Sequence, residues 1–180
     1  MATARQEQLR REAARMFADF GYHGVSIEDL GAAVGISGPG VYRHFPSKDA
    51  LLADLLVGIS EDLLENGRAE VAAAHTPQEA LERLVDKHLN FTLTEPDLIR
   101  VQDRDLASLS LADSHQVRRL QRAYVEVWVD QLVPPLTRDE ARARVHAVFG
   151  LLNSTPHIED PQARAPMLRA MALAAVAAPA

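Results

Sequence analysis

The sequence predicts an all-α fold, with a small N-terminal three-helix head (1–50) followed by a larger helical body (51–180). Apolar residues recur at helical spacing along the chain, and no stretch shows sustained alternation of apolar and polar residues. Capping residues, glycines and prolines separate these periodic segments at short intervals, as in helical domains with short connections. A chain of 180 residues can bury a core without covalent staples, and it contains no cysteine.

Three helices are expected in the head. The first covers about residues 5–20 and ends at Gly21, because glycine readily adopts the left-handed conformation that stops a helix. The second is capped by Ser26, followed three residues later by an acidic residue as in a capping box. The third is capped by Ser37 and covers residues 38–45, with a proline in its first turn, where a missing N–H costs little.

Six further helices are expected in the body. Ser47 opens a long helix that ends near Gly67, and the later helices open at Thr-Pro, acidic and capping-box signals. Their expected ranges are about 76–91, 94–109, 113–132, 137–152 and 163–178.

The charge distribution argues against a protein that coats nucleic acid without sequence specificity. The formal net charge is -6. Residues 1–50 hold six basic and six acidic groups, so residues 51–180 carry the whole excess, with 13 basic against 19 acidic groups. A neutral head can still meet DNA through a local basic edge. No signal pattern and no apolar run long enough to span a bilayer is present, so we expect a cytoplasmic protein without a membrane partner.

The sequence does not favour an enzyme. Asp113, Ser114 and His115 are adjacent, but successive helical residues point roughly 100° apart, so they do not form a hydrogen-bonded triad. The seven histidines show no metal-ligand spacing, and no glycine-rich phosphate loop is present. We therefore expect no catalytic residue, no metal and no cofactor.

Residues 26–45 have the pattern of a helix-turn-helix, with two short helices joined by a tight turn. After the apolar positions are assigned to the underside, the outer face of the third helix retains Ser37, Gly38, Pro39, Gly40, Tyr42, Arg43 and His44. Small residues let the backbone approach base edges, while Tyr42, Arg43 and Lys48 offer groups to phosphates or bases. The alternative is that Gly-Pro-Gly is only a turn and Tyr42 a half-buried ring.

The run SGPGVYRHFPSKDALL (37–52), with Phe17, Gly21, Ser26 and Ile27 before it, resembles the DNA-binding head of the tetracycline-repressor (TetR) family over about residues 8–52. The resemblance implies DNA contacts at Ser26, Ser37, Pro39, Tyr42, His44 and Lys48, with Arg43 contacting a base or a phosphate. Gly38 departs from the family pattern because a longer polar side chain often stands there, and Val41 replaces a common leucine. The first departure shifts base readout toward Arg43 and Pro39.

The resemblance also implies a homodimer that joins through the last two helices of each subunit and binds a near-palindromic operator in double-stranded DNA. In this chain those helices would be about residues 138–153 and 163–178. Seven apolar residues are expected to line the resulting four-helix seam: Val145, Phe149, Leu152, Leu168, Met171, Leu173 and Val176.

A helical body of this type is implied to enclose a small-molecule effector. The expected pocket residues are His88, Phe91, Gln102, Tyr124, Val127 and Trp128, although the same set also suits an ordinary core. The segment 124–154, notably HAVFGLLNS, resembles regulators linked to lipid or acyl-thioester catabolism, which suggests an acyl thioester or a fatty acid. The alternative is a helix-turn-helix or structural dimer without an effector.

Overall fold

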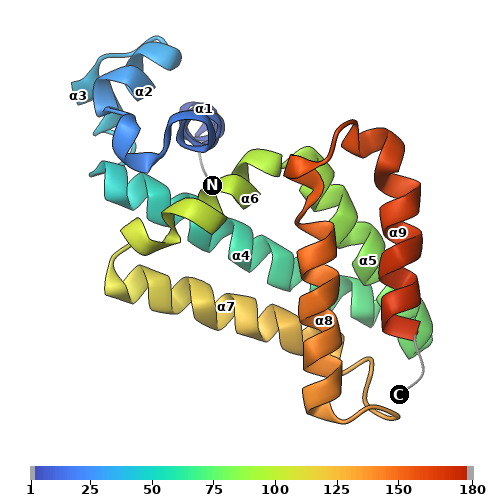
Figure 1. Ribbon diagram of the computed structural model, residues 1–180. Helices are drawn as coiled ribbons and strands as arrows, with labels where there is room; N and C mark the ends of the chain where they lie inside the picture. The colour runs from blue at the N-terminus through green and yellow to red at the C-terminus, as the bar shows by residue number, and fades with distance from the viewer. Residues whose placement is uncertain (1–2, 178–180) are drawn as a thin grey trace. The chain divides into compact units, whose positions relative to one another are not determined.

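The computed structural model describes residues 3–177, which form nine α-helices and three short 3-10 helices without a strand (Figure 1). The expectation of an all-α fold is confirmed. The described chain divides into two compact units: residues 3–59 together with 97–117, and residues 60–96 together with 118–177. None of the helices in the described part of the chain is both long and apolar enough to cross a membrane.

The first unit begins with the three predicted head helices, α1 (Ala4–Phe20), α2 (Ile27–Ala33) and α3 (Gly38–Val41), with a 3-10 turn η1 (Tyr22–Gly24) after α1. The Ser26 capping box is confirmed, because its hydroxyl accepts from the Asp29 N–H and the Asp29 carboxylate accepts from the Ser26 N–H. Helix α3 is shorter than the predicted range 38–45: the residues after Tyr42 form a turn, and Ser37 makes no side-chain cap bond.

The turn between α2 and α3 depends on two glycines. Gly35 has a φ of +72°, which favours glycine. Gly31 accepts a hydrogen bond of 2.9 Å from the Ile36 N–H. A Cβ at Gly31 would lie 2.7 Å from the Ile36 carbonyl oxygen, so no larger residue fits there without moving the backbone. This close approach sets the position at which α3 begins.

A later stretch of the chain completes the first unit. Helix α6 (Pro96–Asp105), the 3-10 turn η2 (Leu106–Ser108) and the beginning of α7 (Leu111–Val129) belong to it, and Val101 and Val117 are fully buried in its core. The Arg104 guanidinium donates to the carbonyl oxygens of Phe17 and, at 3.2 Å, of Ala18. A cation at the last turn of α1 is also favoured by the helix dipole. The compact unit that holds the head helices therefore extends beyond residue 50.

The second unit contains the remainder of α4 (Lys48–Ala72), α5 (Pro77–Thr94), most of α7, α8 (Arg138–Leu152), the 3-10 turn η3 (Thr155–His157) and α9 (Pro161–Ala177). Helix α9 packs against α5 and α8, and the three lie side by side in Figure 1. The predicted caps at Thr76 and Thr137 are confirmed. Helix α7 begins earlier than predicted, because the Ser110 hydroxyl accepts from the Asp113 N–H at 3.1 Å.

Gly67 does not end a helix, contrary to the prediction, because α4 continues through it to Ala72. The residue is buried, and a Cβ there would lie 2.6 Å from Cε2 of Tyr124. Helix α4 therefore carries a glycine at this position because the Tyr124 ring occupies the space of a side chain.

Replacing Gly67 with Ala should lower the free energy of unfolding by about 1–2 kcal/mol, because overpacking against Tyr124 outweighs the better helix propensity of alanine. Gly58→Ala is the matched control, since it lies in the same helix and a Cβ there meets nothing within 4 Å. That variant should gain up to about 1 kcal/mol. Urea unfolding followed by circular dichroism measures the free energy of unfolding of both variants. Equal changes in the two variants would show that the Tyr124 ring moves aside without a loss of stability.

Candidate nucleic-acid interface

The segment 37–44 presents an outward face close to the predicted one. Ser37, Pro39, Tyr42 and Arg43 are exposed, and His44 is half-buried. Tyr42 keeps 52% of its surface exposed, so its ring is not a core ring and its hydroxyl is free to meet a partner. These side chains project from one short turn of helix and the turn that follows it.

The two glycines of this segment serve packing as well as access. Gly38 is buried, and a Cβ there would lie 3.1 Å from Oε1 of Glu28. A Cβ at Gly40 would lie 3.3 Å from Cβ of Ile36. Both contacts are tight, so Gly38 lets α3 begin close to α2, Gly40 lets α3 pack on Ile36 of the preceding turn, and neither adds a bulky side chain to the outer edge.

Two predicted contact residues already have partners within the head. The Ser26 hydroxyl donates to the Asp29 carboxylate at 2.6 Å, and hydrogen bonds from Ser26 lower the pKa of that carboxyl. The Lys48 ammonium donates to the carbonyl oxygens of Tyr22 at 2.9 Å and Val25 at 2.7 Å. It also lies 4.3 Å from the centre of the Tyr22 ring. Lys48 thus ties the beginning of α4 to the segment that precedes α2.

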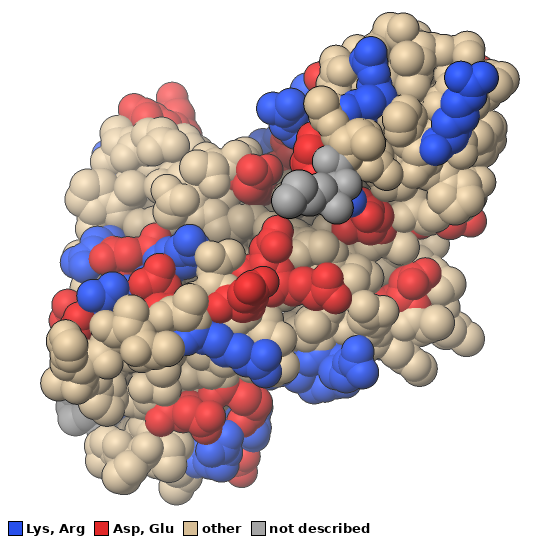
Figure 2. Space-filling model, turned by 180° about the vertical axis from the view of Figure 1, so that it is seen from behind, with Lys and Arg blue, Asp and Glu red and all other residues tan. Residues whose placement is uncertain are grey.

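The basic residues of the head differ in their availability. Arg5 donates to the Val34 carbonyl at 2.6 Å, and Arg10 forms two hydrogen bonds to Asp54 at 2.5 and 2.9 Å. Arg43 is exposed, and its guanidinium has no hydrogen-bond or ion-pair partner among residues 3–177. Figure 2 shows that, on the face it draws, lysine and arginine side chains form small groups interspersed with acidic ones. Arg11 is also exposed without a side-chain partner in the described residues, but Arg43 is the one that lies on the outward face of residues 37–44.

Comparison with known proteins identifies the family. Residues 9–55 match the model of "Bacterial regulatory proteins, tetR family", and residues 74–157 match "Tetracyclin repressor-like, C-terminal domain". The chain belongs to the TetR family. It is 29% identical over 150 residues to the regulator CymR of Pseudomonas putida, covering 80% of this chain and 73% of that protein. It is 27% identical over 176 residues to the repressor Rv1474c of Mycobacterium tuberculosis, covering 84% and 92%. As a TetR-family protein it is a DNA-binding transcriptional regulator rather than an enzyme.

Solved structures of bacterial regulators share the fold across nearly the whole chain. A regulator from Bordetella parapertussis superposes with a TM-score of 0.86 at 24% identity, covering 96% of this chain and 94% of that one. AibR in complex with isovaleryl coenzyme A and operator DNA gives 0.79 at 18% identity, covering 94% and 96%. FadR from Bacillus subtilis in complex with stearoyl-CoA gives 0.71 at 17% identity, covering 94% and 98%.

The second unit brings four predicted pocket residues together as an aromatic cluster. His88 lies against Phe91, Tyr124 and Trp128, with ring centres 5.8–6.1 Å apart. Val127 is half-buried in the same core, whereas Gln102 belongs to the first unit and is not part of the cluster. The prediction placed Phe149 elsewhere, but its ring stacks on His88 at 4.7 Å with an interplanar angle of 3°.

The hydrogen bonds of His88 define its tautomer. Nε2 lies 3.0 Å from Oδ1 of Asn153, which only accepts, so the neutral ring carries its proton on Nε2 and accepts from the Tyr124 hydroxyl at Nδ1 over 3.3 Å. Burial lowers the pKa of His88 to about 4, and burial also raises the pKa of Tyr124. The cluster is therefore uncharged at neutral pH.

Trp128 introduces one unsatisfied polar group into this cluster. The side chain is fully buried, and its indole Nε1–H interacts with the Tyr124 hydroxyl but makes no hydrogen bond of normal geometry within residues 3–177. A buried donor without a partner costs about 1–3 kcal/mol. The cluster thus holds a donor that an acceptor atom entering from outside the chain would satisfy.

The residues of the predicted dimer seam differ in their exposure within the single chain. Val145, Leu152, Leu168 and Val176 are at most 4% exposed within the single chain, so they are core residues and offer a partner almost no surface. Met171 is 48% exposed and Leu173 half-buried. The outward faces of α8 and α9 carry small residues and methionines instead: Ala143, Ala147, Gly150, Met167, Ala170, Met171 and Ala174.

His88 makes stability depend on pH. The unfolded imidazole protonates below its ordinary pKa of 6.5 and the folded one only near 4, so the unfolded state binds more protons in this window and stability falls as pH falls. The loss should be roughly 3 kcal/mol. In urea unfolding between pH 7 and 4.5, His88→Gln should show a flatter decline than the parent, with a variant at exposed His115 as control for the loss of one histidine. Identical declines would refute this role of His88.

Proposed function

We propose that this regulator is a homodimeric cytoplasmic repressor that binds a near-palindromic operator and is released by a small apolar or acyl effector. The observation that carries the DNA contact is the exposed face of residues 37–44, which combines small residues with an unpaired arginine. The relative from Mycobacterium tuberculosis is itself named a repressor. DNA binding, dimerisation and effector binding rest on different parts of the chain.

The DNA contacts divide into positioning and reading groups. Ser37 and Tyr42 are exposed hydroxyl donors for phosphate oxygens, and Arg43 is assigned to a base edge or the adjacent phosphate. Pro39, Gly40 and His44 complete the face that approaches the groove, and the buried Gly38 lets α3 pack against Glu28 beneath it. Ser26 and Lys48 support the geometry of this face, since their polar groups are already engaged, and their contacts to phosphate would be additional.

The dimer interface is assigned to the outward faces of α8 and α9. These faces expose small apolar residues and two methionines, each nearly half exposed, which leaves the two helices free to approach the same pair in a second copy. A two-fold dimer presents its heads to two half-sites, which is why the operator is expected to be near-palindromic.

The effector is assigned to the aromatic cluster of the second unit. Its rings supply an apolar environment, and the unsatisfied Trp128 N–H supplies a directional donor for a ligand carbonyl or similar acceptor. AibR and FadR, two proteins of the same fold, have been crystallised with isovaleryl coenzyme A and stearoyl-CoA. These observations favour an acyl thioester over other apolar molecules.

Arg43→Ala should weaken operator binding and relax sequence preference, because a bidentate base contact discriminates by about 1–3 kcal/mol. Tyr42→Phe should weaken binding to all DNA alike, since a phosphate contact carries no base information. Mobility-shift assays on DNA upstream of the regulator's own gene, with single-base operator variants, separate the two effects. Arg68→Ala removes an exposed arginine from the second unit and is the control. An Arg43→Ala protein with unchanged affinity and preference would refute the assignment.

Met171→Glu should yield monomers and lower operator affinity by at least about a hundredfold, because the bivalent contact is lost and a charge faces the seam. Leu111→Glu is the matched control: Leu111 is 80% exposed and belongs to the first unit, so that variant should remain dimeric. Sedimentation velocity and a mobility-shift assay measure both properties. A dimeric Met171→Glu protein would place the interface elsewhere.

A further inference from the structure

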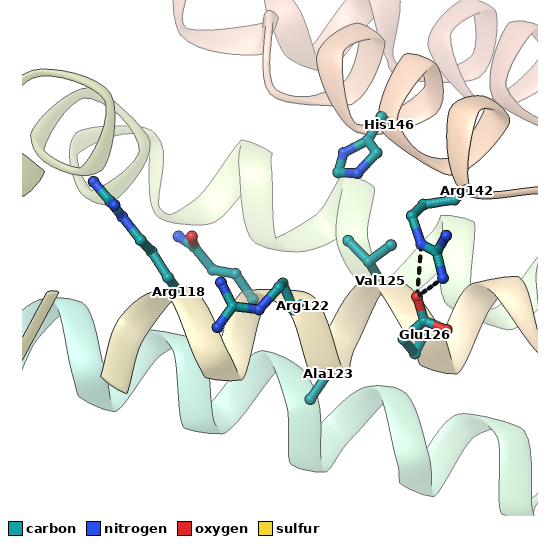
Figure 3. A pocket seen from close by; sticks show the side chains of 8 residues that line it. Arg118, Arg122, Ala123, Val125, Glu126, Arg142 and His146 are labelled. Carbon is teal, nitrogen blue, oxygen red and sulfur yellow. Dashed lines mark hydrogen bonds and ion pairs between the residues drawn. The ribbon is translucent and has the colours of Figure 1, made fainter. Parts of the chain in front are cut away.

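A hollow of about 550 Å³ lies between α7 and α8 in the second unit. It is separate from the aromatic cluster, since none of the cluster rings lines it. Its lining residues are Arg118, Gln121, Arg122, Ala123, Val125, Glu126, Arg142 and His146. Figure 3 shows Arg118 and Arg122 on α7 and, from α8, His146 and Arg142. The volume falls within the range of small-molecule sites.

The hollow is cationic on an otherwise acidic chain. Three arginines and one glutamate line it, a formal net charge of +2 with His146 neutral, against -6 for the whole chain. Arg118 and Arg122 are exposed, and neither guanidinium group has a hydrogen-bond or ion-pair partner within the described residues. Because they are four residues apart on one helix, their side chains lie on the same face. Two uncompensated guanidinium groups therefore face one small volume.

The remaining charges of the hollow are fixed. Arg142 donates to Oε1 of Glu126 through Nε at 2.9 Å, and its Nη2 lies 2.8 Å from the same oxygen. Hydrogen bonds from Arg138 and Arg142 lower the pKa of Glu126, so this carboxylate stays ionised and holds Arg142 at the edge of the hollow. Glu126 balances Arg142, which leaves Arg118 and Arg122 as the charges without a counterion.

The chemistry of the lining selects a class of ligand. Guanidinium groups pair with phosphate through two parallel hydrogen bonds, and two such groups in one place favour a ligand with at least two negative charges. Val125 and Ala123 add apolar surface, which suits the non-ionic part of a nucleotide or carrier. A free fatty acid carries a single carboxylate and would leave one arginine uncompensated.

We propose that this hollow binds the phosphorylated carrier of the effector, so that the regulator recognises an acyl thioester of coenzyme A type rather than a free acid. The inference rests on the proposed effector function for its biological role, while the anion site itself can be tested alone. Arg118 and Arg122 bind the phosphates, and Arg142 and His146 border them.

The site is tested by titrating coenzyme A, without an acyl chain, into the full-length protein by calorimetry. The double variant Arg118→Gln, Arg122→Gln should bind it about tenfold more weakly or worse, as expected for the loss of charge-assisted hydrogen bonds. Arg119→Gln is the matched control, because Arg119 is exposed on the same helix but does not line the hollow. Equal affinity of the double variant and the parent would overturn the site. Inorganic pyrophosphate binding as tightly as coenzyme A would overturn the assignment to a carrier.

Operator release separates this inference from the proposed function. Octanoyl coenzyme A should release the operator from the parent protein at lower concentration than from the double variant, whereas any release by octanoate should be the same for both. If octanoyl coenzyme A binds through the arginines but releases no operator, the effector proposal fails and the anion site stands. If octanoate and octanoyl coenzyme A release the operator equally well from both proteins, the effector proposal stands and the carrier site fails.

Discussion

The approach of the Ile36 carbonyl to Gly31 leaves no room for a side chain, and the geometry of the head depends on it. The Ile36 N–H is bonded to the Gly31 carbonyl across the same contact, so the chain leaves α2 in a single direction before α3 begins. That turn determines the position of the exposed face at residues 37–44. Two charged side chains fix the neighbouring segments. The Lys48 ammonium donates to two carbonyl oxygens before α2, and the Arg104 guanidinium donates to carbonyl oxygens in the last turn of α1.

The elements of the head were predictable because their signals are local. Apolar periodicity, the Ser26 capping box and the left-handed glycines each act over a few residues, and the structure retains them. The contacts of Lys48 and Arg104 were not predictable in the same way. They join a cation to backbone carbonyl groups 23 to 87 residues away, and any carbonyl along the chain is an equally good acceptor.

In the body, apolar periodicity predicts the helices but not which apolar face packs in the core and which faces a partner. The stripe of α8 that contains Val145, Phe149 and Leu152 is apolar, but an apolar stripe is equally suited to the chain's own core and to a second subunit. The structure assigns two of these residues to the core and the third to the ring stack on His88. The face left for a partner consists of alanine, glycine and methionine. In the sequence these residues are hard to distinguish from those that face the chain's own core. Gly67 likewise looks like a helix end until the Tyr124 ring opposite it is known.

The first compact unit is discontinuous along the chain, and this has a consequence for biosynthesis. Its core contains Val101 and Val117, and Arg104 binds the last carbonyl groups of α1. A ribosome that has completed only the first 59 residues has therefore not yet made the groups that cover this core. The apolar faces of the nascent N-terminal helices therefore stay partly exposed while residues 60–96 are synthesised. Closure of that core consequently follows the synthesis of residues 60–117, after its first helices have been made.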